Sequence, residues 1–348
     1  MTEYTHHIAL VGAGTIGLSM LALHLRRPDT KVTVYDPRPD YESLVRAQLP
    51  AFLDSTLSTS REVSQNVIND LIASSRLTLA PSLQDAVQSA TIIQEQTPEK
   101  LDSKQALWKE VVRFADREAH LWSSSSGIAA SKQAAECDDH VAERLVVAHP
   151  FNPPHLMPLV EIVPGPQTKP ERVEFVKTYF EDVPGPSHLP GSRNSQDRVQ
   201  HYRPIILHKE VPGFVGNRLA FALLREACYL VGEGVVSARD LDSIVTASLG
   251  PRWAGSGVFE SYHAGGGEGG IGGFLDKLAP TVKDVWGQLG RVDIQTGGQG
   301  DDEKEKWREV VVRQTEEAYG PNTSEETRLR KEVMLRGVIE MQKQCWSA

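Results

Sequence analysis

The chain has few cysteines. Cys137, Cys228 and Cys345 are the three cysteines among 348 residues, and none of them belongs to a Cys-x-x-Cys pair. This spacing argues against a disulfide framework and a structural zinc site, and it fits a reducing, cytoplasmic compartment. Cys345 is fourth from the end in "CWSA", but Trp346 and Ser347 are poor residues for the aliphatic positions of a prenylation signal. We therefore expect neither a metal site nor a lipid anchor.

Positive charge is also scarce. The chain has 37 Lys and Arg residues against 46 Asp and Glu residues, for a formal net charge of −9. Nucleic acids and anionic membranes need a basic face, so neither is expected as a partner, although a local site could still bind an acidic small molecule. The 18 residues of 8–25 carry no Lys, Arg, Asp or Glu, but no basic flank precedes them and they contain three glycines. A nucleotide-binding strand and helix explains this run better than a signal peptide or a membrane span.

Strand-like and helix-like segments alternate in the first part of the chain. The strand candidates are residues 8–11, 31–36, 76–80, 90–95, 119–124, 145–149 and 159–163. Such alternation predicts an α/β fold, a Rossmann-type doubly wound and mostly parallel sheet with helices on both faces. Strand signals stop near residue 205, and helical spacing follows over 215–249 and 274–289, with the glycine-rich segment 263–274 between them. We expect a nucleotide-binding domain over 1–204, with 184–204 as an inserted loop or hinge, and an all-helical domain over 205–348.

The segment "VGAGTIG" carries a dinucleotide-binding pattern. Gly12, Gly14 and Gly17 have the G-x-G-x-x-G spacing between a strand and a helix, and the helix begins with Thr15 and Ile16. Its free N–H groups would hold a pyrophosphate. Asp36 ends the next strand, 19 residues after Gly17. A carboxylate at this position accepts hydrogen bonds from the hydroxyls of the adenosine ribose and repels a 2′-phosphate.

NAD is therefore the expected cofactor. Two alternatives remain open at this end of the site. Arg38 could pair with a 2′-phosphate or stack on the adenine, and Asp36 could be a turn residue before Pro37.

A titratable pair lies in a proline-rich stretch, "AHPFNPPHLMPLVEIVPGP". His149 ends one strand candidate and Glu161 lies in the next, so adjacent strands could bring them side by side. A histidine can accept the proton of a hydroxyl group while its hydride leaves, and a carboxylate on the other ring nitrogen fixes the tautomer. On the residues alone, a strand-end histidine and a solvated glutamate explain the pair equally well.

Several blocks resemble the 3-hydroxyacyl-CoA dehydrogenase family, most closely its lambda-crystallin/L-gulonate 3-dehydrogenase branch. They are "IIQEQTPEKLDSK", "SSSSGIAASK", "AHPFNPPHLMPLVEIVPGPQT", "KEVPGFVGNRL", "REACYLVGEGVVSARDLD" and "SLGPRWAGSGVFE", and together they span about 290 residues. The resemblance implies an NAD-dependent oxidoreductase with a helical domain that contributes to the substrate site and forms a homodimer.

The resemblance also implies roles for single residues. His149 would be the general base oriented by Glu161, and Ser126 and Asn217 would orient the substrate oxygen. Without the family, Ser126 reads as a helix cap or loop serine and Asn217 as a polar residue at a helix start. The residues expected on the nicotinamide side of the cofactor are Glu99, Lys104 and Asn152, of which Glu99 and Lys104 otherwise read as a solvated helix face.

The substrate is less well determined than the cofactor. Residues 41–75 contain only two basic side chains, Arg46 and Arg61, which disfavours a CoA thioester and favours a free acid resembling L-gulonate. Arg252 in "LGPRW" could hold the acid's carboxylate in a bidentate fork, or could be a surface arginine. The long 184–204 loop and the glycine run 265–273 depart from the family pattern and favour a mobile lid or an altered pocket.

Three alternatives to a gulonate-like substrate stay open. They are a short-chain L-3-hydroxyacyl-CoA dehydrogenase, an enzyme of specialised metabolism acting on an unusual β-hydroxy or β-keto acid, and a non-catalytic, crystallin-like NAD-binding protein.

Overall fold

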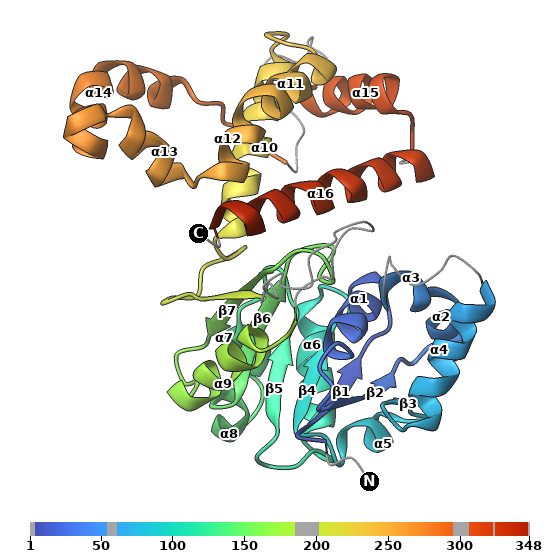
Figure 1. Ribbon diagram of the computed structural model, residues 1–348. Helices are drawn as coiled ribbons and strands as arrows, with labels where there is room; N and C mark the ends of the chain where they lie inside the picture. Colours follow the sequence, from blue (N-terminus) through green and yellow to red (C-terminus); the bar gives the residue numbers. More distant parts are fainter. Residues whose placement is uncertain (1–3, 54–60, 185–201, 295–305, 323, 347–348) are drawn as a thin grey trace. The chain divides into compact units, whose positions relative to one another are not determined.

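The computed structural model describes residues 4–53, 61–184, 202–294, 306–322 and 324–346. The chain divides into two compact units, Met1–Asn217 and Arg218–Ala348. Each unit has its own fold and is described separately (Figure 1).

The first unit is built on one eight-stranded sheet with the order β3-β2-β1-β4-β5-β6-β7-β8. All neighbouring strands are parallel except β6 and β7, which pair antiparallel. The strands are β1 (His6–Val11), β2 (Thr30–Tyr35), β3 (Leu77–Leu79), β4 (Ile92–Glu95), β5 (His120–Ser123), β6 (Leu145–Pro150), β7 (Leu159–Pro164) and β8 (Arg203–Ile206). The predicted mostly parallel doubly wound sheet is therefore confirmed.

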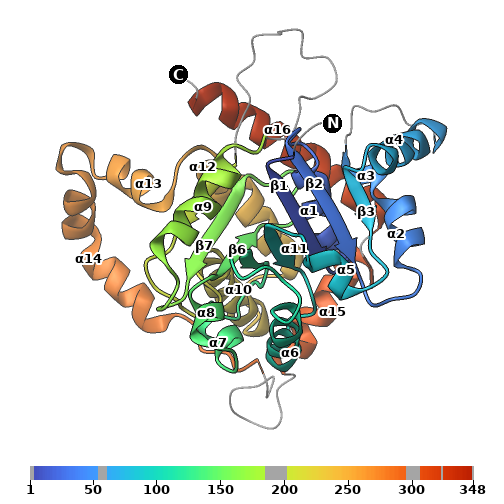
Figure 2. The same ribbon diagram turned by 90° about the horizontal axis from the view of Figure 1, so that it is seen from below.

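Helices cover both faces of this sheet. The helices of the first unit are α1 (Thr15–His24), α2 (Tyr41–Gln48), α3 (Pro50–Leu53), α4 (Arg61–Ala73), α5 (Leu83–Val87), α6 (Leu101–Val111), α7 (Ala130–Ala134), α8 (Asp139–Ala142) and α9 (Pro170–Glu181). Buried apolar side chains of α1, α2 and α9 form a core on one face, and α9 lies beside β7 (Figure 2). Side chains of α5, α6, α7 and α8 form the core on the other face. Most residues of the inner strands are buried because both faces are covered, whereas the edge strands β3 and β8 are largely exposed or half-buried.

The first unit extends beyond the boundary expected after residue 204. β8 runs from Arg203 to Ile206 and pairs with β7, so a cut after 204 falls inside a strand of the sheet. The unit continues through the "KEVPGFVGN" segment to Asn217. Residues 185–201, which hold most of the predicted inserted loop, lie outside the described residues.

Among its described residues, the second unit contains helices and connecting turns but no strand. Its elements are α10 (Gly216–Gly232), α11 (Ala238–Ile244), η1 (Val245–Leu249), α12 (Gly250–Gly255), α13 (Val258–Gly265), η2 (Gly267–Gly269), α14 (Gly270–Gln288), α15 (Trp307–Tyr319) and α16 (Glu325–Trp346). α10 begins at the end of the first unit and continues into the second. Among the described residues, no helix is both long and apolar enough to cross a membrane.

The glycine run is more regular than its sequence indicates. Gly265 ends α13, and Gly270 begins α14 with a φ of +53°. A Cβ on Gly266 would lie 1.6 Å from the Gly270 carbonyl oxygen, and a Cβ on Gly270 would lie 2.5 Å from the His263 ring. Close backbone approach between α13 and α14 therefore explains these glycines, and most of the predicted glycine-rich break is helical.

Candidate active site

The glycine turn lies between β1 and α1. Gly12 has a φ of +102°, and a Cβ there would lie 2.9 Å from the Gln96 carbonyl oxygen. A Cβ on Gly17 would lie 2.0 Å from the Gly12 carbonyl oxygen, so this glycine permits the close packing of helix on strand. A Cβ on Gly14 would have no neighbour within 4 Å, and no side chain caps α1. The first N–H groups of α1, at Thr15 and Ile16, are therefore not occupied by a side-chain cap and are suited to bind a pyrophosphate.

Asp36 follows β2 and lies against the same turn. Its Oδ2 accepts a hydrogen bond from the Ala13 N–H at 2.8 Å, and Arg38 forms an ion pair with the carboxylate at 2.7 Å. Burial alone would raise the pKa of Asp36, but the hydrogen bonds from Arg38 and Ala13 outweigh it and hold that pKa below its usual value. A carboxylate is therefore present next to the phosphate-binding turn, where a ribose is expected.

His149 and Glu161 lie opposite each other in the sheet. They are register partners in the antiparallel pair β6–β7, and His149 Nδ1 is 2.9 Å from Glu161 Oε2. The other carboxylate oxygen of Glu161 accepts hydrogen bonds from the backbone N–H groups of Val215 at 3.0 Å and Gly216 at 2.9 Å. His149 is 5% and Glu161 3% exposed. The titratable pair predicted from the proline-rich stretch is thus brought together.

The hydrogen bonds around Glu161 keep its carboxylate ionised. Burial alone would raise the pKa of Glu161, but the hydrogen bonds from His149, Gly216 and Val215 bring that pKa below its ordinary value. An ionised carboxylate can only accept a hydrogen bond, so the Nδ1 of His149 donates to Glu161 and Nε2 is the ring nitrogen that remains available to a substrate. Among the described residues, none hydrogen-bonds Nε2. The ring contacts the rings of Phe151 and Phe214, whose centroids are 4.9 and 5.5 Å from its own.

An unusual turn brings the two N–H groups to Glu161. Gly213 has a φ of +74° and the following Phe214 a φ of +52°, although Phe214 is fully buried. A bulky residue in this left-handed region is strained and is found where surrounding structure holds it. The turn directs Val215 and Gly216 to the carboxylate, and a Cβ on Gly216 would lie 2.2 Å from the Phe151 ring. The importance of this turn was not recognised from the sequence.

Ser126 and Asn217 are in contact, but the contact is made by the backbone carbonyl of Ser126 and not by its hydroxyl group. Asn217 Nδ2 donates to the Ser126 carbonyl oxygen at 2.9 Å. One oxygen of Glu99 accepts from Ser125 Oγ at 2.6 Å, Ser126 N at 3.0 Å and Gly127 N at 2.9 Å. These bonds shape the loop after β5 and leave Ser126 exposed. The predicted contacts of Ser126 and Asn217 with a substrate oxygen stay predictions.

Lys104 has a partner that sequence reasoning missed. Its ammonium lies 2.7 and 2.9 Å from the two oxygens of Glu95, and the two side chains are 1% and 0% exposed. Thr97 and Ser123 also donate to Glu95. A direct contact of Lys104 with a cofactor is therefore not favoured by this geometry. Glu95 could have been suspected from its position, because it is an acid at the carboxyl end of a buried strand.

Asn152 lies in the loop that joins β6 to β7, and its peptide bond to Pro153 is cis. This loop is attached to α1 because Ser19 Oγ bonds both the backbone N–H and the Nδ1 of His155, at 2.9 and 2.8 Å. Asn152 itself is exposed. It follows β6 by two residues, so it lies near the His149 end of that strand.

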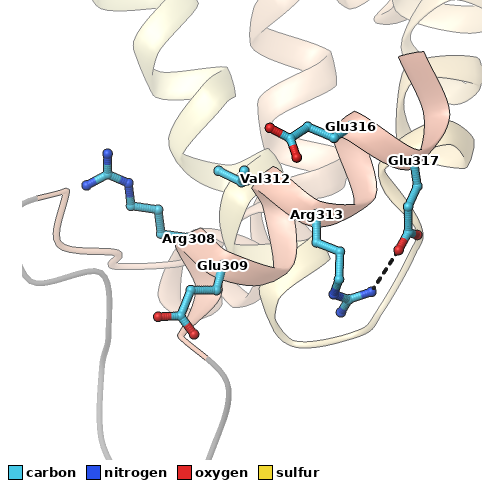
Figure 3. Close-up of a pocket in the computed structure, with 6 residues that line it drawn as sticks. All are labelled: Arg308, Glu309, Val312, Arg313, Glu316 and Glu317. Carbon is cyan, nitrogen blue, oxygen red and sulfur yellow. Dashed lines mark ion pairs between the residues drawn. The ribbon is translucent and has the colours of Figure 1, made fainter. Parts of the chain in front are cut away.

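Two features lie on the second unit. Arg252 is an exposed residue of α12, and its predicted contact with a substrate carboxylate stays a prediction. A hollow on α15 is lined by charged side chains, among them the ion pair Arg313–Glu317 at 3.6 Å (Figure 3). This hollow contains none of the predicted site residues.

Comparisons with known proteins give the chain its family. Residues 7–186 match the model of the 3-hydroxyacyl-CoA dehydrogenase NAD-binding domain, and residues 213–284 match that of the C-terminal domain of the same family. An L-carnitine dehydrogenase of Streptomyces coelicolor is 34% identical over 97% of this chain and 94% of its own. A 3-hydroxyacyl-CoA dehydrogenase of Gibberella moniliformis is 35% identical over 81% of this chain and 80% of its own.

Solved structures agree on the fold. The crystal structure of a 5-formyl-3-hydroxy-2-methylpyridine 4-carboxylic acid 5-dehydrogenase superposes with a TM-score of 0.69 at 23% identity, covering 97% of each chain. These relatives do not single out the lambda-crystallin branch, so that finer assignment stays a prediction. The glycine turn, Asp36 and the family models agree on the cofactor, and the chain belongs to the 3-hydroxyacyl-CoA dehydrogenase family as an NAD-dependent dehydrogenase.

Proposed function

We propose that the protein oxidises the 3-hydroxyl group of a free L-3-hydroxy acid to the 3-keto acid, with His149 as the general base. The observation that carries this proposal is the His149–Glu161 pair. The carboxylate is fixed by two backbone N–H groups and orients the imidazole through Nδ1. Such a pair is suited to accept a proton from an alcohol at neutral pH.

The chain's own residues divide the work as follows. The turn at Gly12–Gly17 and Asp36 hold the dinucleotide, and bound NAD supplies the hydride acceptor. His149 Nε2 takes the hydroxyl proton, and Glu161 stabilises the imidazolium that forms. Asn217 and Ser126 orient the substrate oxygen. Glu99 and Asn152 contact the nicotinamide side, and Lys104 acts there through its ion pairs with Glu95 and Glu99 rather than by contact.

Two observations favour a free acid over a CoA thioester. Several relatives that cover most of the chain are named L-carnitine dehydrogenase, and carnitine is a free 3-hydroxy acid. The segment 41–75 has two basic residues against the four acids Glu42, Asp54, Glu62 and Asp70, which disfavours the phosphates of CoA. L-carnitine is the first substrate to test, and L-gulonate is the second. Arg252 would hold the carboxylate of either acid.

The test of the substrate is NADH formation from NAD with L-carnitine, L-gulonate, L-3-hydroxybutyrate and L-3-hydroxybutyryl-CoA. Turnover of a free acid with a higher kcat/KM than the thioester supports the proposal. Preference for the thioester would overturn the free-acid assignment. NADH binding without turnover of any member, or of a wider set of β-hydroxy acids, would favour the non-catalytic alternative. Arg252→Met should raise KM for the acid, and an unchanged KM would remove that contact.

The test of the base uses two variants. His149→Ala should lower kcat by about 100-fold to 10,000-fold, the usual contribution of a general base. In Glu161→Gln the amide oxygen can still accept from Val215 and Gly216, so its NH₂ group faces Nδ1 and moves the ring proton to Nε2. We therefore expect a comparable loss of kcat with unchanged NADH affinity. His140→Ala, a histidine on α8, is the matched control. Wild-type kcat in His149→Ala would contradict the mechanism.

A further inference from the structure

The carboxylate of Asp36 has no free acceptor position. Its Oδ1 accepts hydrogen bonds from the backbone N–H of Arg38 at 3.0 Å and from the Nε of Arg38 at 2.7 Å. Its Oδ2 accepts hydrogen bonds from the Ala13 N–H at 2.8 Å and from the Nη2 of Arg38 at 2.7 Å. A carboxylate offers about four lone-pair positions, and these four donors use them all. A ribose hydroxyl can therefore bind Asp36 only where one of these donors leaves.

The donors differ in how easily they can leave. The N–H groups of Ala13 and Arg38 belong to the backbone beside the glycine turn and are fixed. The other two bonds come from one guanidinium, whose side chain is 45% exposed while the side chain of Asp36 is 7% exposed. An ion pair with one exposed partner is weak, and the flexible side chain of arginine can turn into solvent. The two hydroxyls of an adenosine ribose would then replace the two guanidinium donors one for one.

We propose that Arg38 is a cofactor-specificity residue that competes with the adenosine ribose for Asp36 and, once displaced, pairs with a 2′-phosphate. The competition weakens NADH binding. The displaced guanidinium meanwhile lies beside the ribose and offers a 2′-phosphate a bidentate partner that partly offsets the repulsion by Asp36. Arg38 thus narrows the preference for NAD over NADP. This inference concerns dinucleotide binding alone and does not depend on the substrate proposed above.

The experiment measures NADH and NADPH dissociation constants by nucleotide fluorescence, without substrate, for the wild type and Arg38→Ala. NADH should bind about three-fold more tightly to the variant, which is the scale of an exposed ion pair. NADPH should bind about ten-fold more weakly, because a bidentate phosphate contact is lost. Arg117→Ala removes the same charge before β5, at the opposite end of the sheet, and should change neither constant.

A second background separates competition from a general charge effect. In Asp36→Asn the carboxylate is gone, so adding Arg38→Ala should no longer improve NADH binding. A gain that persists there would show that Arg38 does not act through Asp36. Weaker NADH binding to the single variant Arg38→Ala would mean that the arginine holds the adenosine instead, and an unchanged ratio of NADPH to NADH affinity would end the specificity role.

Discussion

At the scale of single residues, two buried carboxylates are stabilised in different ways. The carboxylate of Glu161 accepts hydrogen bonds from an imidazole and two backbone N–H groups, whereas the carboxylate of Glu95 forms an ion pair with the ammonium of Lys104. A buried carboxylate without such partners would be protonated. Each carboxylate therefore makes the stability of the fold depend on its partners.

The first prediction concerns pH. The folded pKa of Glu161 lies below its ordinary value of 4.5, so the folded state binds fewer protons than the unfolded state between the two values. The stabilisation is fully present above the ordinary value and is lost as pH falls through the folded pKa. In urea unfolding from about pH 6 down to about pH 3, the free energy of unfolding of Glu161→Gln should fall less steeply than that of the wild type. Glu174→Gln, on α9, should keep the wild-type slope, and equal slopes in all three proteins would contradict the assignment.

The second prediction concerns the Glu95–Lys104 pair. Glu95→Gln leaves the buried ammonium of Lys104 with only its longer contact to Glu99, at 3.6 Å, and Lys104→Met leaves the buried Glu95 without a cation. Each should lower the free energy of unfolding by about 3 kcal/mol. The double variant should lose less than the sum of the two, because no lone charge remains. Additive losses in denaturant titrations would show that the two side chains are not energetically coupled.

At the scale of elements, two glycines of the turn between β1 and α1 have different roles, one in packing and one in cofactor binding. Gly17 is needed because a Cβ there meets the Gly12 carbonyl at 2.0 Å, whereas Gly14 faces open space. The same motif therefore contains one glycine for the fold and one for the ligand.

This gives the third prediction. Gly17→Ala should lower the free energy of unfolding by at least about 2 kcal/mol through overpacking. Gly14→Ala should leave that free energy within about 0.5 kcal/mol of the wild type and weaken NADH binding by an order of magnitude or more. Thermal unfolding and NADH fluorescence separate the two effects. A stable Gly17→Ala with normal NADH affinity would contradict the packing role.

The strands and the glycine turn were predictable because their signals are local. Alternating β-branched residues and glycine spacing depend on the neighbouring chain alone, and His149 opposite Glu161 follows from pairing two adjacent strands. The Glu95–Lys104 pair was not predictable, because its burial depends on how α6 lies on β4. The helical glycine run was also missed, since close contact between α13 and α14 there overrides the low helix propensity of glycine.

At the scale of the whole molecule, the second unit exposes large apolar side chains. α13 and α14 pack through Tyr262 and Phe274, whose ring centroids are 4.8 Å apart. They leave Phe259 and Trp286 78% and 71% exposed. Extensive exposed apolar surface marks an interaction site, which supports the expected homodimer.

The fourth prediction follows from this surface. Light scattering after gel filtration should give the mass of a dimer for the wild type. Phe259→Glu combined with Trp286→Glu should shift the protein toward the monomer without loss of helical circular dichroism. Arg308→Glu, a charge substitution on α15, is the control and should stay dimeric. A monomeric wild type would contradict the proposed homodimer.

The left-handed turn at Gly213 and Phe214 has a consequence for protein engineering. Through Val215 and Gly216, the peptide that leads into α10 is hydrogen-bonded to the partner of His149. A chimera that takes its helical unit from a relative should therefore be joined after Asn217. A junction near residue 205 would exchange, along with the helices, the backbone that orients the imidazole.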